Sequence, residues 1–112
     1  MKVIQVLPDL NTGGVERGTV ELSKALVAAG CSAYVISSGG VLVNELTQAG
    51  AIHIQVPVGK KHISSLLQVR KIRKIIMEIG PEIVHVRSRV PAWLVFLAMR
   101  FIPKSQRPIV VS

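Results

Sequence analysis

The chain has 112 residues, which is enough for one small domain with a hydrophobic core and too few for two. Hydrophobic residues make up 49% of it and charged residues 18%, a balance that excludes intrinsic disorder. Fourteen Lys and Arg against six Asp and Glu give a formal net charge of +8, which favours an anionic partner. The single cysteine, Cys31, excludes an internal disulfide and a cysteine zinc cluster, and it suggests a reducing compartment.

The longest apolar run covers residues 90–99, about half of the roughly 20 residues that a membrane-spanning helix needs. It predicts a buried helix instead. Residues 1–6 show neither the apolar stretch nor the small-residue cleavage site of a signal peptide. We therefore expect a cytoplasmic protein, at most peripheral on the inner face of a membrane.

Strand and helix patterns alternate along the chain. The expected strands are residues 3–7, 32–37, 52–56, 82–86 and a fifth from 108, and the expected helices are 14–29, 42–48, 63–79 and 91–102. In the first helix we place Val15, Gly18, Thr19, Leu22 and their neighbours in register on the apolar face, with Ser23 off it. Gly30 follows as a C-cap, and Pro91 fits the first turn of the last helix.

Such alternation predicts a parallel sheet with right-handed crossovers, in a doubly wound, Rossmann-like α/β domain. The expected strand order is 3-2-1-4-5. Ligands of these folds bind beyond the carboxyl ends of the strands, where the strand order reverses. This directs attention to residues 8–14, after the first strand, and 87–91, after the fourth.

The loop after the first strand contains Gly13 and Gly14 directly before a helix. Backbone N–H groups at a helix start favour phosphate, although a tight turn with close helix packing at Gly18 would need the same glycines. Val15 breaks the G-x-G-x-x-G pattern, and Thr19 stands where a Walker A lysine is required. These departures disfavour NAD-dependent and P-loop chemistry.

The loop after the fourth strand carries the second group of candidates. His85 is placed to act as an acid, a base or a sugar-binding group, or else as a hydrogen-bonded core histidine. Arg87 and Arg89 flank Ser88, and two arginines there would hold a phosphate or carboxylate, or form a solvated rim. We expect Trp93 to belong to the core.

A basic stretch without acidic residues covers residues 59–74. Its cationic members are Lys60, Lys61, Arg70, Lys71, Arg73 and Lys74. Val69, Ile72 and Ile76 form the opposite, apolar face, whereas Leu67 falls among the basic residues. This mixture suits an anionic membrane surface, and it also suits a cover helix with a solvated face. Nucleic acid is the least favoured partner, because only 4% of the residues are aromatic.

Taken together, these motifs resemble family 4 glycosyltransferases. Residues 10–17 are similar to the glycine-rich GGxE loop of that family, and residues 21–30 to its first helix. Residues 81–93 are similar to its fourth strand and the following loop. The resemblance implies the N-terminal part of a GT-B fold, in which two Rossmann-like domains face each other across a cleft and transfer a sugar from an activated donor.

The resemblance also implies roles for particular residues. Gly13 and Gly14 would offer backbone N–H groups to the donor diphosphate, and Glu16 would help to set their loop. His85 would lie beside the transferred sugar as the catalytic candidate. Arg87, Ser88 and Arg89 would face a glycan or lipid-linked acceptor of the cell envelope. No metal and no cofactor is implied, because the nucleotide sugar is a substrate.

The family's main donor site lies in a C-terminal domain that residues 1–112 do not contain, and the domain itself looks cut short after its fifth strand. We therefore expect the chain alone to be inactive and to need that missing domain as a partner. Self-association through an open sheet edge is a further expectation. The rival readings are a non-catalytic module for a phosphate-bearing ligand or anionic surface, and a nucleotide-cofactor enzyme of another Rossmann type.

Overall fold

The computed structural model describes residues 1–11, 13–58, 65–87 and 89–111, with the backbone alone at 65, 66 and 89–91. In chain order the elements are β1 (Lys2–Val6), α1 (Gly14–Ala28), β2 (Ser32–Ser37), α2 (Val43–Gln48), β3 (Ile52–Gln55), α3 (Ser65–Ile79), β4 (Ile83–Val86), α4 (Arg89–Arg100), the 3-10 helix η1 (Lys104–Gln106) and β5 (Ile109–Val111). Every predicted strand and helix is present, with ends that shift by one or two residues where they can be compared.

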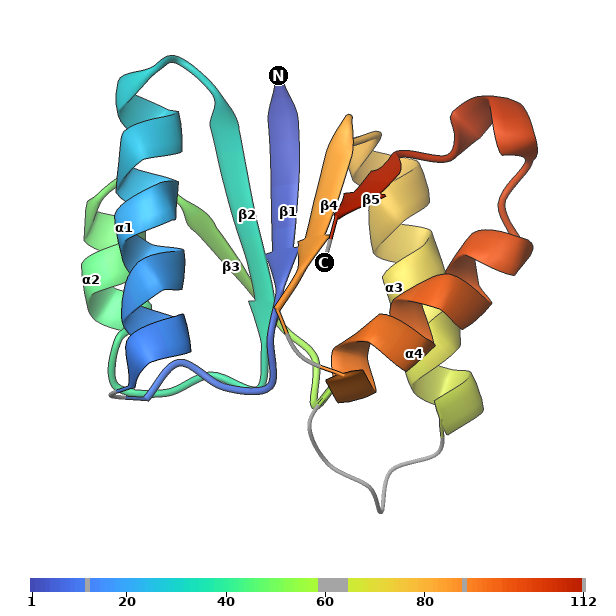
Figure 1. Ribbon diagram of the computed structural model, residues 1–112, viewed down its shortest axis with the longest axis horizontal. Helices are drawn as coiled ribbons and strands as arrows, with labels where there is room; N and C mark the ends of the chain where they lie inside the picture. Colours follow the sequence, from blue (N-terminus) through green and yellow to red (C-terminus); the bar gives the residue numbers. More distant parts are fainter. Residues whose placement is uncertain (12, 59–64, 88, 112) are drawn as a thin grey trace.

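The five strands form one parallel sheet in the order β3-β2-β1-β4-β5. Helices α1 and α2 cover one face, and α3 and α4 cover the other (Figure 1). The predicted doubly wound, Rossmann-like fold and its strand order are confirmed. Central β1 is buried from Val3 onward, as expected for a strand that is covered on both faces.

Two hydrophobic clusters hold the three layers together. The larger lies under α3 and α4 and includes Ile4, Ile36, Ile72 and Val95. The smaller lies under α1 and α2 and includes Leu7, Val35 and Leu46. Among the described residues, no helix is long and apolar enough to cross a membrane.

The buried face of α1 is rotated relative to the predicted one and shares Thr19 with it. Thr19, Val20 and Ser23 are its buried residues, whereas Val15 is 47% exposed. The apolar periodicity misled here because β1 places a polar side chain, Gln5, beneath this helix, where Ser23 becomes its hydrogen-bond partner.

Trp93 is also not in the core, since it is 70% exposed on α4. Helix α4 begins at Arg89, two residues before the start predicted at Pro91. Proline is tolerated there because N–H groups in the first turn have no partner within the helix.

Candidate polar site at the carboxyl ends of β1 and β4

The candidate site begins with the loop that connects β1 to α1. Three backbone hydrogen bonds fasten this loop to the segment after β2: Ser38 N–H to the Pro8 carbonyl at 2.8 Å, Leu10 N–H to the Gly39 carbonyl at 2.9 Å, and Leu42 N–H to the Leu10 carbonyl at 2.8 Å. The glycine-rich loop is therefore built on a second loop, which fixes its path. The sequence alone gave no indication of this contact.

At the start of α1, Gly13 is the N-cap residue and accepts a 2.9 Å hydrogen bond from the Arg17 N–H. A Cβ atom on Gly13 would lie 2.9 Å from the Glu16 carboxylate oxygens, whereas one on Gly14 would meet nothing within 4 Å. Glu16 thus folds back over the N-cap, where its negative charge interacts favourably with the positive end of the helix dipole. Its expected place at the helix start is where the structure has it.

Arg87 follows β4 and is held by a fully buried glutamine. Its Nε donates a 2.9 Å hydrogen bond to Oε1 of Gln5. The Gln5 amide nitrogen in turn donates to Ser23 Oγ at 2.9 Å and to the Thr19 carbonyl at 3.3 Å. Among the described residues, no side chain is paired with the two terminal nitrogens of Arg87. The network therefore orients a cation while leaving its outer nitrogens available for a ligand.

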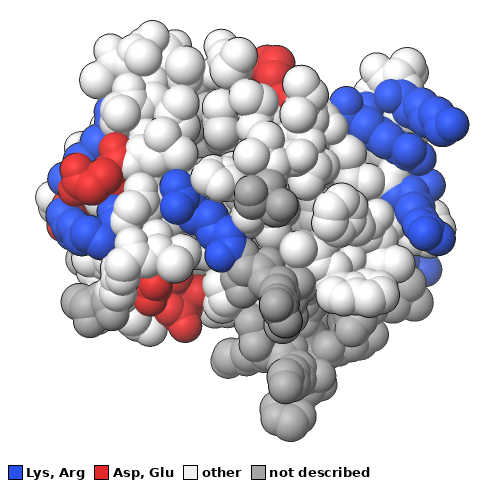
Figure 2. Space-filling view, in the orientation of Figure 1, with Lys and Arg blue, Asp and Glu red and all other residues white. Residues whose placement is uncertain are grey.

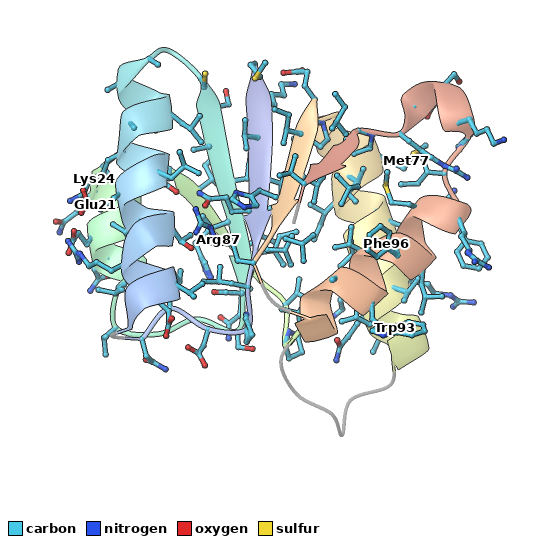
Figure 3. All side chains as sticks on the ribbon, viewed as in Figure 1. Glu21, Lys24, Met77, Arg87, Trp93 and Phe96 are labelled. Atoms are coloured by element: carbon cyan, nitrogen blue, oxygen red, sulfur yellow. The ribbon has the colours of Figure 1, made fainter. Side chains whose placement is uncertain are left out.

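The loop after β1, the start of α1 and the end of β4 form an open pocket of about 250 Å³, which we call the Arg87 pocket; its lining residues are Leu7, Pro8, Asp9, Val15, Glu16 and Arg87. Arg87 lies beside α1, on the side of the sheet that α1 covers (Figure 3). On this face of the molecule, basic side chains (blue) and acidic side chains (red) lie near one another, with uncharged residues (white) between them (Figure 2). The pocket thus combines one guanidinium with two carboxylates at the carboxyl end of the sheet.

His85 lies on β4, two residues before Arg87, and is in register with Gln5 of β1. Partial burial lowers the pKa of His85, and the positive charge of Arg87 lowers it further. Burial also lowers the pKa of Arg87, but from so high a value that the guanidinium stays charged at neutral pH. A neutral imidazole beside a fixed cation is an available proton acceptor.

The remaining predicted site residues are distributed as follows. Ser88, Lys60 and Lys61 lie outside the described residues. Arg89 is the first residue of α4, and its side chain is outside the described part. Arg70, Lys71, Arg73 and Lys74 are exposed on α3, well separated in sequence and layer from the Arg87 pocket.

Sequence reasoning missed Asp9 and Gln5. Asp9 lines the Arg87 pocket directly after β1. Gln5 is the only polar residue between Val3 and Leu7 in a strand that is otherwise apolar. A polar residue in a central strand needs a buried hydrogen-bond partner, and that signal was available in the sequence.

Comparison with known proteins identifies the family. Residues 12–112 match the model of Glycosyltransferase Family 4. The chain belongs to glycosyltransferase family 4. A glycosyltransferase from Rickettsia africae ESF-5, known from its crystal structure, is 39% identical with a TM-score of 0.78, over 90% of this chain and 27% of that one. The family 4 chain is thus an N-terminal domain of the GT-B type.

Two solved structures share only the fold. A putative UDP-N-acetylglucosamine 2-epimerase from Listeria monocytogenes is 11% identical, with a TM-score of 0.57 over 97% of this chain and 30% of that one. Another UDP-N-acetylglucosamine 2-epimerase is 11% identical, with a TM-score of 0.56 over 98% and 32%. The family 4 chain therefore spans about a third or less of each of these three proteins. No curated protein matches it.

We predict that the free energy of unfolding of this domain depends on pH because of two histidines, His53 and His85. Burial lowers the pKa of His53 below 6.5, and burial together with Arg87 does the same for His85. The unfolded chain therefore binds these protons at a higher pH than the folded chain. The stability that the neutral histidines contribute is fully present above the unfolded pKa of 6.5 and is lost as the pH falls from there through their lower folded pKa values. We expect the urea concentration at the denaturation midpoint to decrease as the pH is lowered from about 7 to about 5.

His53 is the better of the two to substitute, because its Nε2 lies 2.6 Å from Ser37 Oγ and because β2 and β1 separate its strand, β3, from β4 and Arg87. His53→Gln keeps a hydrogen-bonding group and removes the titration. Urea denaturation of the variant at several pH values should show a shallower decline than the wild type. An identical decline in both proteins would contradict the assignment.

Proposed function

We propose that the domain is the acceptor-side part of an enzyme that moves a sugar from a nucleotide-sugar donor to a glycan or lipid-linked acceptor of the cell envelope. The observation that carries this proposal is the Arg87 pocket. Its volume of about 250 Å³ lies just below the usual range for small-molecule sites, which suits one sugar ring or phosphate group better than a whole nucleotide sugar. That size agrees with a donor held mainly by a second domain.

The chemistry required matches the groups in and behind the pocket. In sugar transfer an acceptor hydroxyl oxygen bonds to the anomeric carbon, the bond to the donor diphosphate breaks, and the hydroxyl proton departs. Arg87 would stabilise negative charge on a phosphate, because Gln5 already orients it. Asp9 and Glu16 would accept hydrogen bonds from sugar hydroxyls. His85, kept neutral, would lie beside the transferred sugar.

Backbone N–H groups of Gly13 and Gly14 would complete the site from the donor side. Space around Gly14 supports this role, since nothing described lies within 4 Å of where its Cβ would be. Ser88 and Arg89 would extend the acceptor side. The enzyme would work at the inner face of the membrane, and catalysis would need a C-terminal donor domain in addition to residues 1–112.

The reading frame of the native gene across codon 112 tests the two-domain part of the proposal. A frame that continues into a second Rossmann-like domain supports it. A stop codon after Ser112 overturns it in that form, and would direct the search to an adjacent frame that encodes a separate subunit.

Arg87→Lys tests the site in the full-length enzyme. The guanidinium group of arginine can donate to Gln5 and to a phosphate at the same time, whereas the lysine ammonium keeps only the charge. We therefore expect kcat/KM to fall by about 100-fold. The assay measures nucleoside diphosphate release from a panel of uridine- and guanosine-diphosphate sugars. Arg17→Lys is the matched control, because Arg17 lies outside the pocket and pairs with Glu21 and Glu45. Equal losses in both variants would remove Arg87 from the site.

The alternative function is a non-catalytic module that binds a phosphate-bearing ligand. The pre-oriented cation favours it equally, since Arg87 would bind phosphate with or without chemistry. Calorimetry of the chain with inorganic pyrophosphate and with the same nucleotide sugars separates the two. Tight binding of pyrophosphate by a full-length protein that turns over no sugar donor would favour the module.

A further inference from the structure

The outer surface of α3 and α4 exposes large aromatic side chains among basic ones. Trp93 is 70% exposed, Phe96 56% and Phe101 60%, although such residues are usually mostly buried. Arg70 and Arg100 are exposed beside them. We call this set of five residues the aromatic–basic surface.

The direction in which α4 presents these residues argues against an incidental exposure. Leu94, Val95, Ala98 and Met99 are its buried residues and mark the side that faces the sheet. Trp93, Phe96 and Arg100 recur at intervals of three and four, on the opposite side of the helix.

The two helices hold this surface together at the C-terminal end of α4. Arg73 on α3 donates a 2.9 Å hydrogen bond from Nε to the Phe101 carbonyl. Val69, Arg70, Arg73 and Phe101 line a shallow hollow of about 340 Å³. The aromatic rings and guanidinium groups are therefore arranged on a framework that exists before any partner binds.

The charge around the surface has one predominant sign. The basic residues of α3, α4, η1 and the turn after it whose side chains are described are Arg70, Lys71, Arg73, Lys74, Arg100, Lys104 and Arg107. The single acidic residue of these elements is Glu78, which lies 3.9 Å from Lys74. Basic side chains gather along the edge of the molecule beside α4 and η1 (Figure 2). The occupant of this surface must therefore carry negative charge.

We propose that the aromatic–basic surface docks the domain on an anionic phospholipid bilayer. Trp and Phe rings insert at the level of the headgroups, and Lys and Arg bind their phosphates. Exposed aromatic rings on a helix suit a bilayer better than a nucleic-acid strand, which follows a basic groove. The basic stretch had predicted such contact because it mixes basic with apolar residues, and the structure adds exposed aromatic rings that can insert into the bilayer.

This docking would serve the proposed function by placing the pocket near a lipid-linked acceptor. Trp93 lies toward the end of α4 that is nearest the carboxyl ends of the strands, where Arg87 also lies (Figure 3). For that purpose the inference rests on the proposed function, but lipid binding itself does not. Its test contains no sugar donor, so failure of one is distinguishable from failure of the other.

The experiment uses Trp93 as its own probe, since it is the single tryptophan of the chain. Vesicles of phosphatidylcholine with or without phosphatidylglycerol are mixed with the protein, and emission is recorded with and without brominated acyl chains. We expect a blue shift and quenching with anionic vesicles, weakening as salt is added. No shift, or equal shifts with neutral and anionic vesicles, would overturn the proposal.

Variants locate the contact. Arg100→Gln should weaken vesicle binding about fivefold and Phe96→Ser about tenfold, in flotation assays. Lys2→Gln and Val41→Ser are the matched controls, because both positions are exposed elsewhere, and they should bind as the wild type does. Losses as large in the controls would contradict the assignment. So would Trp93 emission that is already blue-shifted in a dimer without lipid, or a preference for RNA over vesicles.

Discussion

Gly40→Ala should lower the free energy of unfolding by about 3 kcal/mol. Gly40 has a φ of +154°, and a Cβ atom there would lie 2.5 Å from the Leu10 carbonyl carbon and 2.8 Å from the Asn11 nitrogen. Both contacts are with backbone, so no side-chain rotation can relieve them. Residues 8–11 would have to move, and the three hydrogen bonds that fasten this part of the loop would be strained. Urea denaturation with an unchanged m-value is the measurement.

Gly39→Ala is the control for this effect. Gly39 also has a positive φ, +101°, but nothing lies within 4 Å of where its Cβ would be. Its substitution should cost only the conformational penalty of about 1 kcal/mol. If the two variants were equally stable, close approach of the two loops would not be the cause. The same pair also separates loop position from fold stability in any binding assay of the Arg87 pocket.

Gln5→Met is expected to lower the free energy of unfolding by about 2 kcal/mol. Methionine keeps most of the volume of glutamine but leaves Arg87 Nε and the Ser23 hydroxyl without their buried partner. The change should also release Arg87, so any phosphate binding in the pocket should weaken. Denaturation measures the first effect, and pyrophosphate titration of the variant measures the second.

Ser23→Ala provides the comparison, because it removes one hydrogen bond to Gln5 while keeping the contact with Arg87. Its cost should be below 1 kcal/mol, roughly, since alanine is also the better helix former. A Gln5→Met variant as stable as Ser23→Ala would show that the bond to Arg87 contributes little. Retention of full anion binding by Gln5→Met would show that Arg87 needs no support.

Joining two loops at one edge of the sheet is what makes this domain suited to a ligand. The loop after β1 contributes Asp9 and the start of α1, and the end of β4 contributes Arg87. They meet because β1 and β4 are neighbours where the strand order reverses. As the last strand of the described sheet, β5 would accommodate a further strand at its free side.

The strands and helices were predictable because each has its own pattern of apolar and polar residues in the sequence. Alternating strand and helix periodicity defined all five strands and four helices, and the parallel order followed from the crossover rule. On α3 the buried apolar residues Val69, Ile72 and Ile76 belong to the predicted apolar face, whereas the buried Gln68 does not. Apolar periodicity predicts burial correctly where the side of a helix that packs on the sheet carries apolar residues at helical spacing.

Contacts between residues that are far apart in the sequence have no such local pattern. Gln5 and Arg87 are 82 positions apart, and Gly40 meets Leu10 across 30 positions of chain. Trp93 has an apolar side chain, and only the packing of α4 on the sheet shows that it points outward. The sequence by itself determined which segments form strands and helices and where their ends meet. The tertiary structure decided which polar groups become buried partners and which apolar ones remain exposed, because both depend on the neighbours that the strand order provides.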